Sequence, residues 1–171
     1  MPELKDELSR LPPRARCAFA AGCAERVLVV YKYLGDAYSY GPERAIRAAW
    51  ACAAGAPVDE AERASIAEEL EGAFPEPEDP QVGVLYAVES AEFALLAATD
   101  PGPDAAFSAA AKAQEAAGYM DQDGGDGEAE EGRWQAEALA LLKAWGDRPV
   151  SRDVFDALNA RTPGWLAAYE D

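Results

Sequence analysis

Residues 12–35 read PPRARCAFAAGCAERVLVVYKYLG and contain the longest helix that the sequence predicts. Pro12 and Pro13 fit the first turn of a helix, and Gly35 fits its end. Between them, apolar side chains recur at steps of three and four residues, at Phe19, Cys23, Val27, Val30 and Leu34. This spacing places them in one stripe along a helix, which must be buried against other elements. We therefore expect a long helix that ends near Leu34 and contributes this stripe to the core.

The rest of the chain is organised in shorter helices. Alanine, the best helix former, supplies 39 of the 171 residues, and proline and glycine lie between the apolar segments. Further helices are expected at residues 3–10, 41–55, 59–72, 82–98, 104–120, 128–145 and 151–160. Segment 82–98 is the most apolar, and we interpret it as a buried central helix and not as a membrane span. The sequence predicts a single all-α domain over residues 1–171, an antiparallel bundle of about seven to eight helices.

The composition excludes several functions. With 32 Asp and Glu against 15 Lys and Arg the formal charge is -17, which argues against nucleic-acid binding because phosphate contacts need basic side chains. Histidine is absent, so a Ser-His-Asp triad and His-ligated zinc or haem are excluded. Cys17, Cys23 and Cys52 form no CxxC pair and no even disulfide framework. No signal peptide or membrane span is recognised, so we expect a cytoplasmic protein. Because the catalytic and metal-binding patterns above are missing, we also expect a protein that is not an enzyme and has no cofactor.

The acidic residues are unevenly distributed along the chain. Residues 1–58 contain six acidic and eight basic residues, whereas residues 59–171 contain 26 acidic and seven basic ones. Residues 59–80 hold nine acids and one base, and residues 121–131 hold six acids and no base. These two runs are either solvated surface or a surface that meets a basic partner protein, since clustered carboxylates steer association with cationic proteins. In the second interpretation the contact residues are Glu76, Glu78, Asp79, Asp121, Asp123, Asp126, Glu128, Glu130 and Glu131.

The acidic, glycine-rich loop at residues 121–127 lies between two expected helices, as a calcium-binding loop does. Its register does not fit an EF-hand. Counting from Asp121, Asp126 stands at the position of the invariant glycine, and Gly132 replaces the bidentate glutamate. We interpret the segment as a flexible acidic loop. Weak cation binding stays open, but no metal site is predicted.

Two glutamates, Glu89 and Glu92, lie three residues apart in the apolar segment 82–98. A buried carboxylate needs a partner, so we expect structural ion pairs with Arg26, Arg44 or Arg47. A carboxylate di-metal site is the alternative, and it is disfavoured because the Glu-x-x-His motifs of such sites are missing.

Glu25 and Arg26 form a second charged pair, inside the otherwise apolar long helix. In one interpretation they lie on the polar flank of that helix. In the other, which we favour slightly, Arg26 is interior and bonds a carboxylate of segment 82–98, fixing the register of the bundle. Both Glu25 and Arg26 are therefore assigned to structural ion pairing.

Two stretches of the chain resemble a known family. They are residues 11–33, with FAAGCAERVL at residues 19–28, and residues 70–91, which begin with LEGAFPEPED. Together they resemble the bacterial YjaG-like family, an all-helical domain of unknown function. The resemblance covers about residues 9–100. Its matching positions are Phe19, Glu25, Arg26, Trp50, Leu70, Glu71, Pro75 and Asp79. More loosely, the chain is similar to the helical immunity proteins of bacterial polymorphic-toxin systems, which are small, acidic and without catalytic residues.

The leading hypothesis follows from the acidic runs and this looser resemblance. It is an immunity protein that neutralises a cognate toxin, a basic nuclease, by presenting carboxylates to the positive groove of the toxin. The alternative is a helical structural or regulatory domain that self-associates and has no toxin partner. A carboxylate metalloenzyme is a distant third. The sequence does not distinguish a monomer from a homodimer.

Overall fold

The computed structural model describes residues 2–35, 39–78, 81–100, 102–121 and 125–167. All the secondary-structure elements assigned in these ranges are helices, so the all-α prediction is confirmed. Seven α-helices of at least eight residues are present in the described ranges: α1 (Pro2–Ser9), α2 (Pro13–Leu34), α3 (Gly41–Ala53), α4 (Glu60–Glu71), α5 (Val82–Ala97), α6 (Asp104–Met120) and α7 (Gly127–Trp145). A 3₁₀ helix, η1 (Arg152–Phe155), and the four-residue helices α8 (Asp156–Asn159) and α9 (Gly164–Ala167) complete the described chain.

Most helix ends follow the local sequence. α2 begins at Pro13 and ends before Gly35, whose backbone N–H donates to the carbonyl of Tyr31 at 2.9 Å. α4 begins after Asp59, whose Oδ1 accepts a hydrogen bond of 2.7 Å from the backbone N–H of Glu62, as expected for an N-cap.

The expected helix at residues 151–160 is wrong as a single element, because the structure divides this segment into η1 and α8. Ser151, which precedes η1, makes no side-chain capping hydrogen bond. At the junction, Phe155 is fully buried, with its ring edge-to-face on Trp50 at 5.8 Å and on Trp134 at 5.2 Å. Tertiary packing of this one ring therefore shapes the segment more than its capping residue does.

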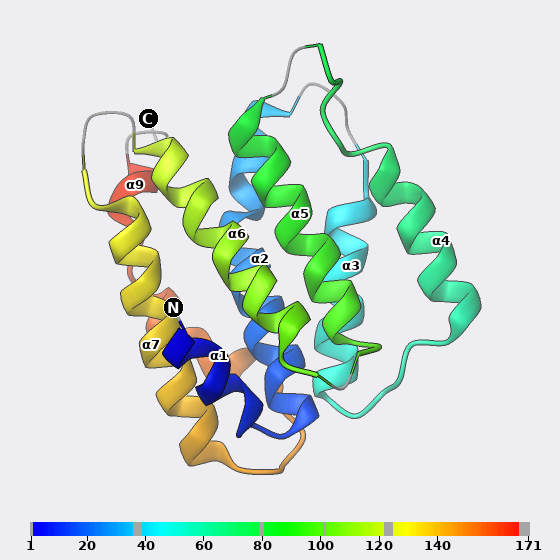
Figure 1. The fold of residues 1–171 in the computed structure, drawn as a ribbon, viewed down its shortest axis with the longest axis vertical. Helices are drawn as coiled ribbons and strands as arrows, with labels where there is room; N and C mark the ends of the chain where they lie inside the picture. Colours follow the sequence, from blue (N-terminus) through cyan, green and yellow to red (C-terminus); the bar gives the residue numbers. More distant parts are fainter. Residues whose placement is uncertain (1, 36–38, 79–80, 101, 122–124, 168–171) are drawn as a thin grey trace.

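Helix α2 lies at the centre of the bundle, and the helices from α2 to α7 run alternately up and down (Figure 1). The helices α3, α5, α6 and α7 all pack against α2, and 13 of its 22 residues are buried. Helix α5, which matches the expected buried helix 82–98, also packs on four helices, α2, α3, α4 and α6, and nine of its 16 residues are buried. It shares the centre of the bundle with α2, and only one side of it is outside the core. The inner side of α5 packs on α2, α3 and α6, while its outer side reaches the surface, where Leu96 is 39% exposed.

Helices α5 and α6 share the most extensive helix–helix contact among the described residues, and both are rich in buried alanine. The buried alanines are Ala87, Ala91, Ala94 and Ala97 on α5 and Ala105, Ala106, Ala109, Ala110, Ala113, Ala116 and Ala117 on α6. Small side chains allow two helix axes to approach near the lower limit of about 8–10 Å for packed helices. The buried apolar residues of the described chain form one contiguous core. Among the described helices, none combines the length and the hydropathy that crossing a bilayer requires.

Candidate partner-binding surface

The acidic run at residues 59–78 lies mainly on α4, a helix at the edge of the bundle beside α3 (Figure 1). Only Ile66 and Leu70 of this helix are buried, so most of its circumference faces solvent. Its exposed carboxylates are those of Glu60, Glu62, Glu68 and Glu71. The one basic residue of the run, Arg63, bonds Glu60, and this hydrogen bond holds the pKa of Glu60 below its ordinary value. The carboxylates at the C-terminal end of α4 have no such neighbour in the run.

The acidic surface continues past the end of α4. Glu76 and Glu78, two of the predicted contact residues, are exposed in the segment that leads toward α5. Asp79, the third predicted contact residue of this segment, lies outside the described residues. Glu69 is half-buried and is held by Arg44, whose Nη1 lies 2.6 Å from its Oε1.

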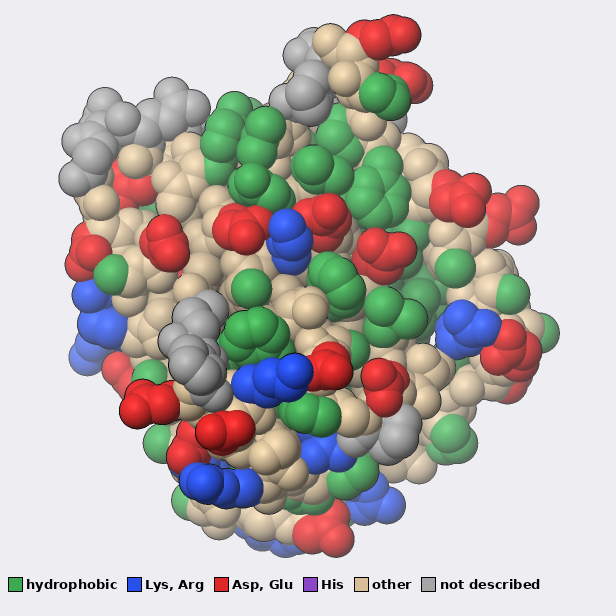
Figure 2. Space-filling view, in the orientation of Figure 1, with side chains coloured by type: hydrophobic (Ala, Val, Ile, Leu, Met, Phe, Trp, Pro, Cys, Tyr) green, Lys and Arg blue, Asp and Glu red, His purple; other side chains and the backbone are tan. Residues whose placement is uncertain are grey.

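Beside α4, the outer side of α5 presents apolar and acidic side chains together. Figure 2 shows hydrophobic side chains gathered over α5 and toward α4, with acidic side chains among them. The outer side chains of α5 are Leu85, Tyr86, Glu89, Glu92, Phe93 and Leu96, all at least partly exposed. We call these residues, together with Glu68, Glu71, Glu76 and Glu78, the α4–α5 face.

The two glutamates of α5 do not pair with the arginines that the sequence analysis named. Glu89 Oε2 lies 3.1 Å from Nζ of Lys112 on α6, and the same ammonium lies 4.8 Å from the centre of the Tyr86 ring. Glu92 has no ion pair among the described residues; burial raises its pKa, and the neighbouring charge of Glu89 raises it further. The expected partners Arg26, Arg44 and Arg47 are therefore wrong, because the outer side of α5 faces α6 and solvent at this level.

The acidic run at residues 121–131 is largely used within the protein itself. The Asp121 carboxylate accepts hydrogen bonds from the backbone N–H groups of Gly125 at 3.2 Å and Gly127 at 2.9 Å, so it orders the start of α7. Both carboxylate oxygens of Glu130 accept from the backbone N–H of Gly164, at 3.0 and 2.9 Å, and so tie α7 to α9. These two predicted contact residues therefore have structural partners.

The remaining residues of this run give little free acidic surface. Asp126 is exposed but has Arg133 as an ion-pair partner at 2.9 Å. Glu128 is exposed, and Asp123 lies outside the described residues. In the ribbon, α4 and the start of α7 lie on opposite sides of the bundle, so the two acidic runs do not form one continuous surface (Figure 1).

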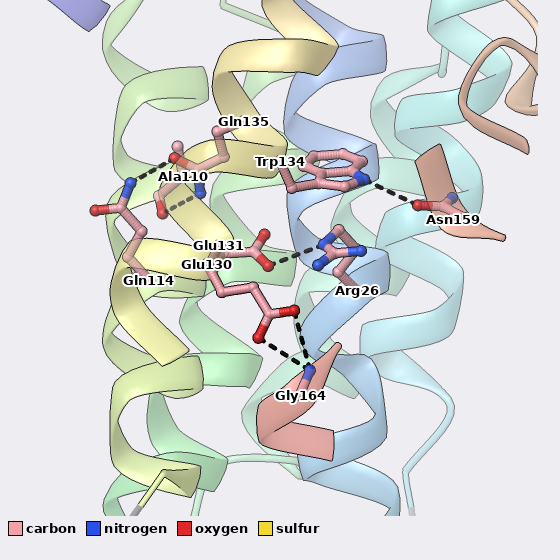
Figure 3. A network of polar contacts seen from close by, with 9 residues as sticks. All are labelled: Arg26, Ala110, Gln114, Glu130, Glu131, Trp134, Gln135, Asn159 and Gly164. Atoms are coloured by element: carbon pink, nitrogen blue, oxygen red, sulfur yellow. Dashed lines mark hydrogen bonds and ion pairs between the residues drawn. The ribbon is translucent and has the colours of Figure 1, made fainter. Parts of the chain in front are cut away.

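Glu131 is fully buried, so the prediction that it contacts a partner is wrong. Its Oε2 lies 2.8 Å from Nε of Arg26, and the Arg26 guanidinium lies 4.7 Å from the centre of the Trp134 ring (Figure 3). Arg26 is therefore interior, but it bonds a carboxylate of α7 and not one of α5. Burial raises the pKa of Glu131, although the adjacent Arg26 charge opposes that shift.

Polar side chains around this ion pair connect α7 to its neighbours (Figure 3). The indole N–H of Trp134 donates to Oδ1 of Asn159 at 3.0 Å. The side-chain amide of Gln135 donates to the carbonyl of Ala110 at 2.9 Å and accepts from Gln114 at 2.7 Å. The acidic residue at 131 thus belongs to a polar network that fixes α7 on α2 and α6.

Glu25, which precedes Arg26 in the sequence, lies outside this network, at the rim of a pocket of about 390 Å³ between α2, α3 and η1. Its Oε1 lies 2.5 Å from Nη2 of Arg152, whose side chain is 67% exposed. At the same pocket Lys32 pairs with Glu43 at 2.7 Å. The charges that line this pocket are therefore largely balanced by each other.

The described residues contain no group of three or more Cys, Asp or Glu side chains arranged to hold a metal ion. A pocket of about 450 Å³ lies beside Asp121, Asp126 and Glu128. Of these carboxylates, that of Asp121 is occupied by backbone N–H groups and that of Asp126 by Arg133. This pocket therefore offers no prepared cation site among the described residues.

The structure brings together two cysteines that the sequence analysis treated as unrelated. The sulfur atoms of Cys17 on α2 and Cys52 on α3 lie 3.3 Å apart. The two residues are 35 positions apart in the chain, and only the antiparallel pairing of α2 with α3 makes them neighbours. No local sequence motif indicates such a pair.

No family model, no curated protein and no solved structure matches this chain. The resemblance to the YjaG-like family stays a prediction.

Proposed function

We propose that this protein is a non-enzymatic binding protein whose partner is a basic protein, and that the partner docks on the α4–α5 face. The observation that carries the proposal is the placement of exposed carboxylates at and beyond the end of α4, none of which has an ion pair among the described residues, beside partly exposed apolar side chains of α5. Interfaces commonly combine apolar and aromatic anchors with a charged rim. The apolar residues of α5 supply the anchors, and the glutamates of α4 supply the rim.

Within this class, the proposed function is that of an immunity protein that neutralises a cognate bacterial toxin in the cytoplasm. A nuclease presents a positive groove to its nucleic-acid substrate, and a carboxylate-rich helix fits such a groove in place of phosphates. The formal charge of -17 favours rapid encounter with a partner of this kind. The proposed contact set is narrower than the sequence predicts. Asp121, Glu130 and Glu131 are used inside the protein, and Asp126 and Glu128 lie at the start of α7, on the opposite side of the bundle from α4.

The test uses the C-terminal domain of the protein encoded beside this chain as the binding probe. A complex is expected, with an association rate that falls as salt rises. The triple variant Glu71→Gln/Glu76→Gln/Glu78→Gln should lower that rate by about tenfold at low salt, because rim charges act mainly on association. Leu96→Ala should leave association unchanged and accelerate dissociation, because an apolar anchor acts after encounter.

A matched variant separates a local surface from general charge. Asp126→Asn/Glu128→Gln/Glu137→Gln removes the same charge from the far side of the bundle, where all three side chains are exposed. It should change the association rate by less than about twofold. Equal effects of the two triple variants, or no complex with the neighbouring domain, would contradict the proposal. A concentration-dependent dimer that buries Leu96 would favour the self-association alternative instead.

A further inference from the structure

Two thiols from different helices meet at the C-terminal end of α5. Cys17 Sγ lies 3.3 Å from Cys52 Sγ and 3.1 Å from the carbonyl oxygen of Ala97. Cys52 Sγ lies 3.5 Å from the carbonyl oxygen of Ala98. Both sulfurs are free thiols. The pair is therefore held between three helices without being covalently linked.

The two thiols have different environments. Cys17 is buried, with 1% of its surface exposed, while Cys52 is half-buried. The hydrogen bond that Cys17 donates, together with the positive charge of Arg14, lowers the pKa of Cys52 to about 7 against the opposing effect of burial. The same hydrogen bond and burial raise the pKa of Cys17. At neutral pH the half-buried Cys52 therefore has thiolate character, and the buried Cys17 keeps its proton.

We propose that Cys52 and Cys17 form an oxidisable dithiol, in which Cys52 reacts with a hydroperoxide and Cys17 closes a disulfide. In the first step the Cys52 thiolate attacks one peroxide oxygen and the O–O bond breaks. Cys52 becomes a sulfenic acid, and the leaving alkoxide or hydroxide takes a proton from water. In the second step Cys17 sulfur attacks the Cys52 sulfur, the S–O bond breaks, and the hydroxide that leaves takes the Cys17 proton to form water.

The geometry favours the second step. A disulfide bond is about 2.05 Å long, so the two sulfurs, now 3.3 Å apart, must approach each other by only about 1.3 Å. Helices α2 and α3 pack directly against each other, so the two thiols come from neighbouring elements of the core. A resolving thiol at this distance should capture the sulfenic acid before a second oxidation to sulfinic acid.

The third cysteine supplies an internal control. Cys23 is fully buried, and burial raises its pKa well above the ordinary value, so it should stay a thiol. It is a free thiol that lies on α2, six residues after Cys17 in the sequence. The proposal therefore predicts which two of the three cysteines react.

The test treats the reduced, full-length protein with excess hydrogen peroxide at pH 7 and follows intact mass and alkylatable thiols. The mass should fall by two hydrogen atoms, and thiols accessible after denaturation should fall from three to one. Peptide mapping should identify a Cys17–Cys52 disulfide, and dithiothreitol should reverse it. A gain of oxygen at Cys52 with Cys17 still alkylatable, a disulfide between two chains, or retention of all three thiols would overturn the proposal.

Single substitutions assign the two roles. Cys17→Ser should leave Cys52 to accumulate as a sulfenic acid that dimedone labels, whereas Cys52→Ser should keep both remaining thiols under the same treatment. Cys23→Ser should still form the disulfide and go from two thiols to none. If a substitution at buried Cys17 prevents folding, the peptide map of the wild-type chain together with the Cys52→Ser variant decides the question. Dimedone labelling at Cys17 in place of Cys52 would contradict the assignment.

Discussion

Among the ion pairs of the described residues, Arg26–Glu131 is the most deeply buried. Both side chains are almost fully buried, at 8% and 0% exposure, and the guanidinium also packs on the Trp134 ring. Arg26→Met keeps much of the volume but leaves the Glu131 carboxylate buried without its cation. Removing one partner of a buried pair costs about 3–5 kcal/mol of unfolding free energy. Urea unfolding at pH 7 should show a loss of this size.

The matched control is Arg152→Met, which removes the cation of the Glu25 ion pair at the surface. The Arg152 side chain is 67% exposed, so its pair is screened by solvent and contributes about 0–1 kcal/mol. Equal losses of unfolding free energy in Arg26→Met and Arg152→Met would show that the buried ion pair contributes no more to stability than the exposed one does.

The pH dependence of the Arg26→Met variant follows from the pKa of Glu131. Burial raises that pKa above its ordinary value of 4.5, so in the window above 4.5 the folded chain binds more protons than the unfolded chain. The free energy of unfolding therefore falls as pH rises through this window. Removing Arg26 raises the pKa further, so the gap between variant and wild type should widen with pH by up to about 1.4 kcal/mol per unit. Urea titrations between pH 5 and 7 measure it, and Arg26→Met/Glu131→Gln should lose this dependence.

Sequence reasoning found one charged residue of the interior, Arg26, but neither its partner nor the interior position of Glu131. It placed Arg26 inside the bundle and expected a carboxylate of segment 82–98, whereas the partner, Glu131, lies 105 residues away. Glu131 was misassigned because it ends a dense acidic run, and the run gives no indication of which member turns inward. The Cys17–Cys52 contact was missed for the same reason, since both contacts depend on how helices pair in space.

At the scale of elements, most helices could be predicted because proline, glycine and aspartate mark their ends along the chain. The exposure of one side of α5 could not be predicted. A helix that is apolar all round normally lies in a core, but α5 shares the centre of this bundle with α2, whose alanines and Gly22 let other helices approach closely. The outer side of α5 consequently reaches solvent, and this surplus of apolar surface is what the proposed partner would cover.

Gly22 of α2 tests this close approach. A Cβ atom there would lie 2.7 Å from Phe155 Cε2 and 2.9 Å from Trp134 Cη2, both in rings that pack into the core. Alanine favours a helix by about 1 kcal/mol over glycine, but overpacking a core costs about 1–3 kcal/mol. Gly22→Ala should therefore lower the unfolding free energy by up to about 2 kcal/mol, as measured by urea denaturation.

The control for this substitution is Gly132→Ala on α7, where a Cβ would lie 3.5 Å from the Gln114 side chain, an ordinary contact. With no clash to oppose it, the gain in helix propensity should raise the unfolding free energy by about 0.5–1 kcal/mol. A stabilising effect of Gly22→Ala as well would show that the aromatic rings move aside at little cost.

At the scale of the whole molecule, the two acidic runs of the sequence contribute differently to the charged surface. Residues 1–58 carry a small positive balance and supply the buried cation Arg26, while the excess of acids lies on helices that follow. In the run at residues 121–131, the carboxylates of Asp121 and Glu130 make hydrogen bonds within the protein, whereas most of the carboxylates at the end of α4 are exposed. Among the described residues, the run at residues 59–78 therefore contributes more exposed carboxylates without an ion pair than the run at residues 121–131 does.

A net charge of -17 should make stability depend on salt in a definite direction. Like charges repel each other across the compact state more than in the extended chain, and added salt screens that repulsion. Raising sodium chloride from about 20 mM to about 0.5 M shortens the Debye length from roughly 20 Å to roughly 4 Å. We expect the Tm to rise by about 3–6 °C, which corresponds to about 1–2 kcal/mol for a chain of this size. The exposed ion pairs weaken under the same conditions, but each contributes too little to reverse the trend.

In the variant Glu68→Gln/Glu71→Gln/Glu76→Gln/Glu78→Gln the Tm should be higher at low salt and its dependence on salt smaller, because four exposed like charges have been removed. A Tm that falls with salt in the wild type would mean that its ion pairs, and not its repulsions, dominate the electrostatics of the fold.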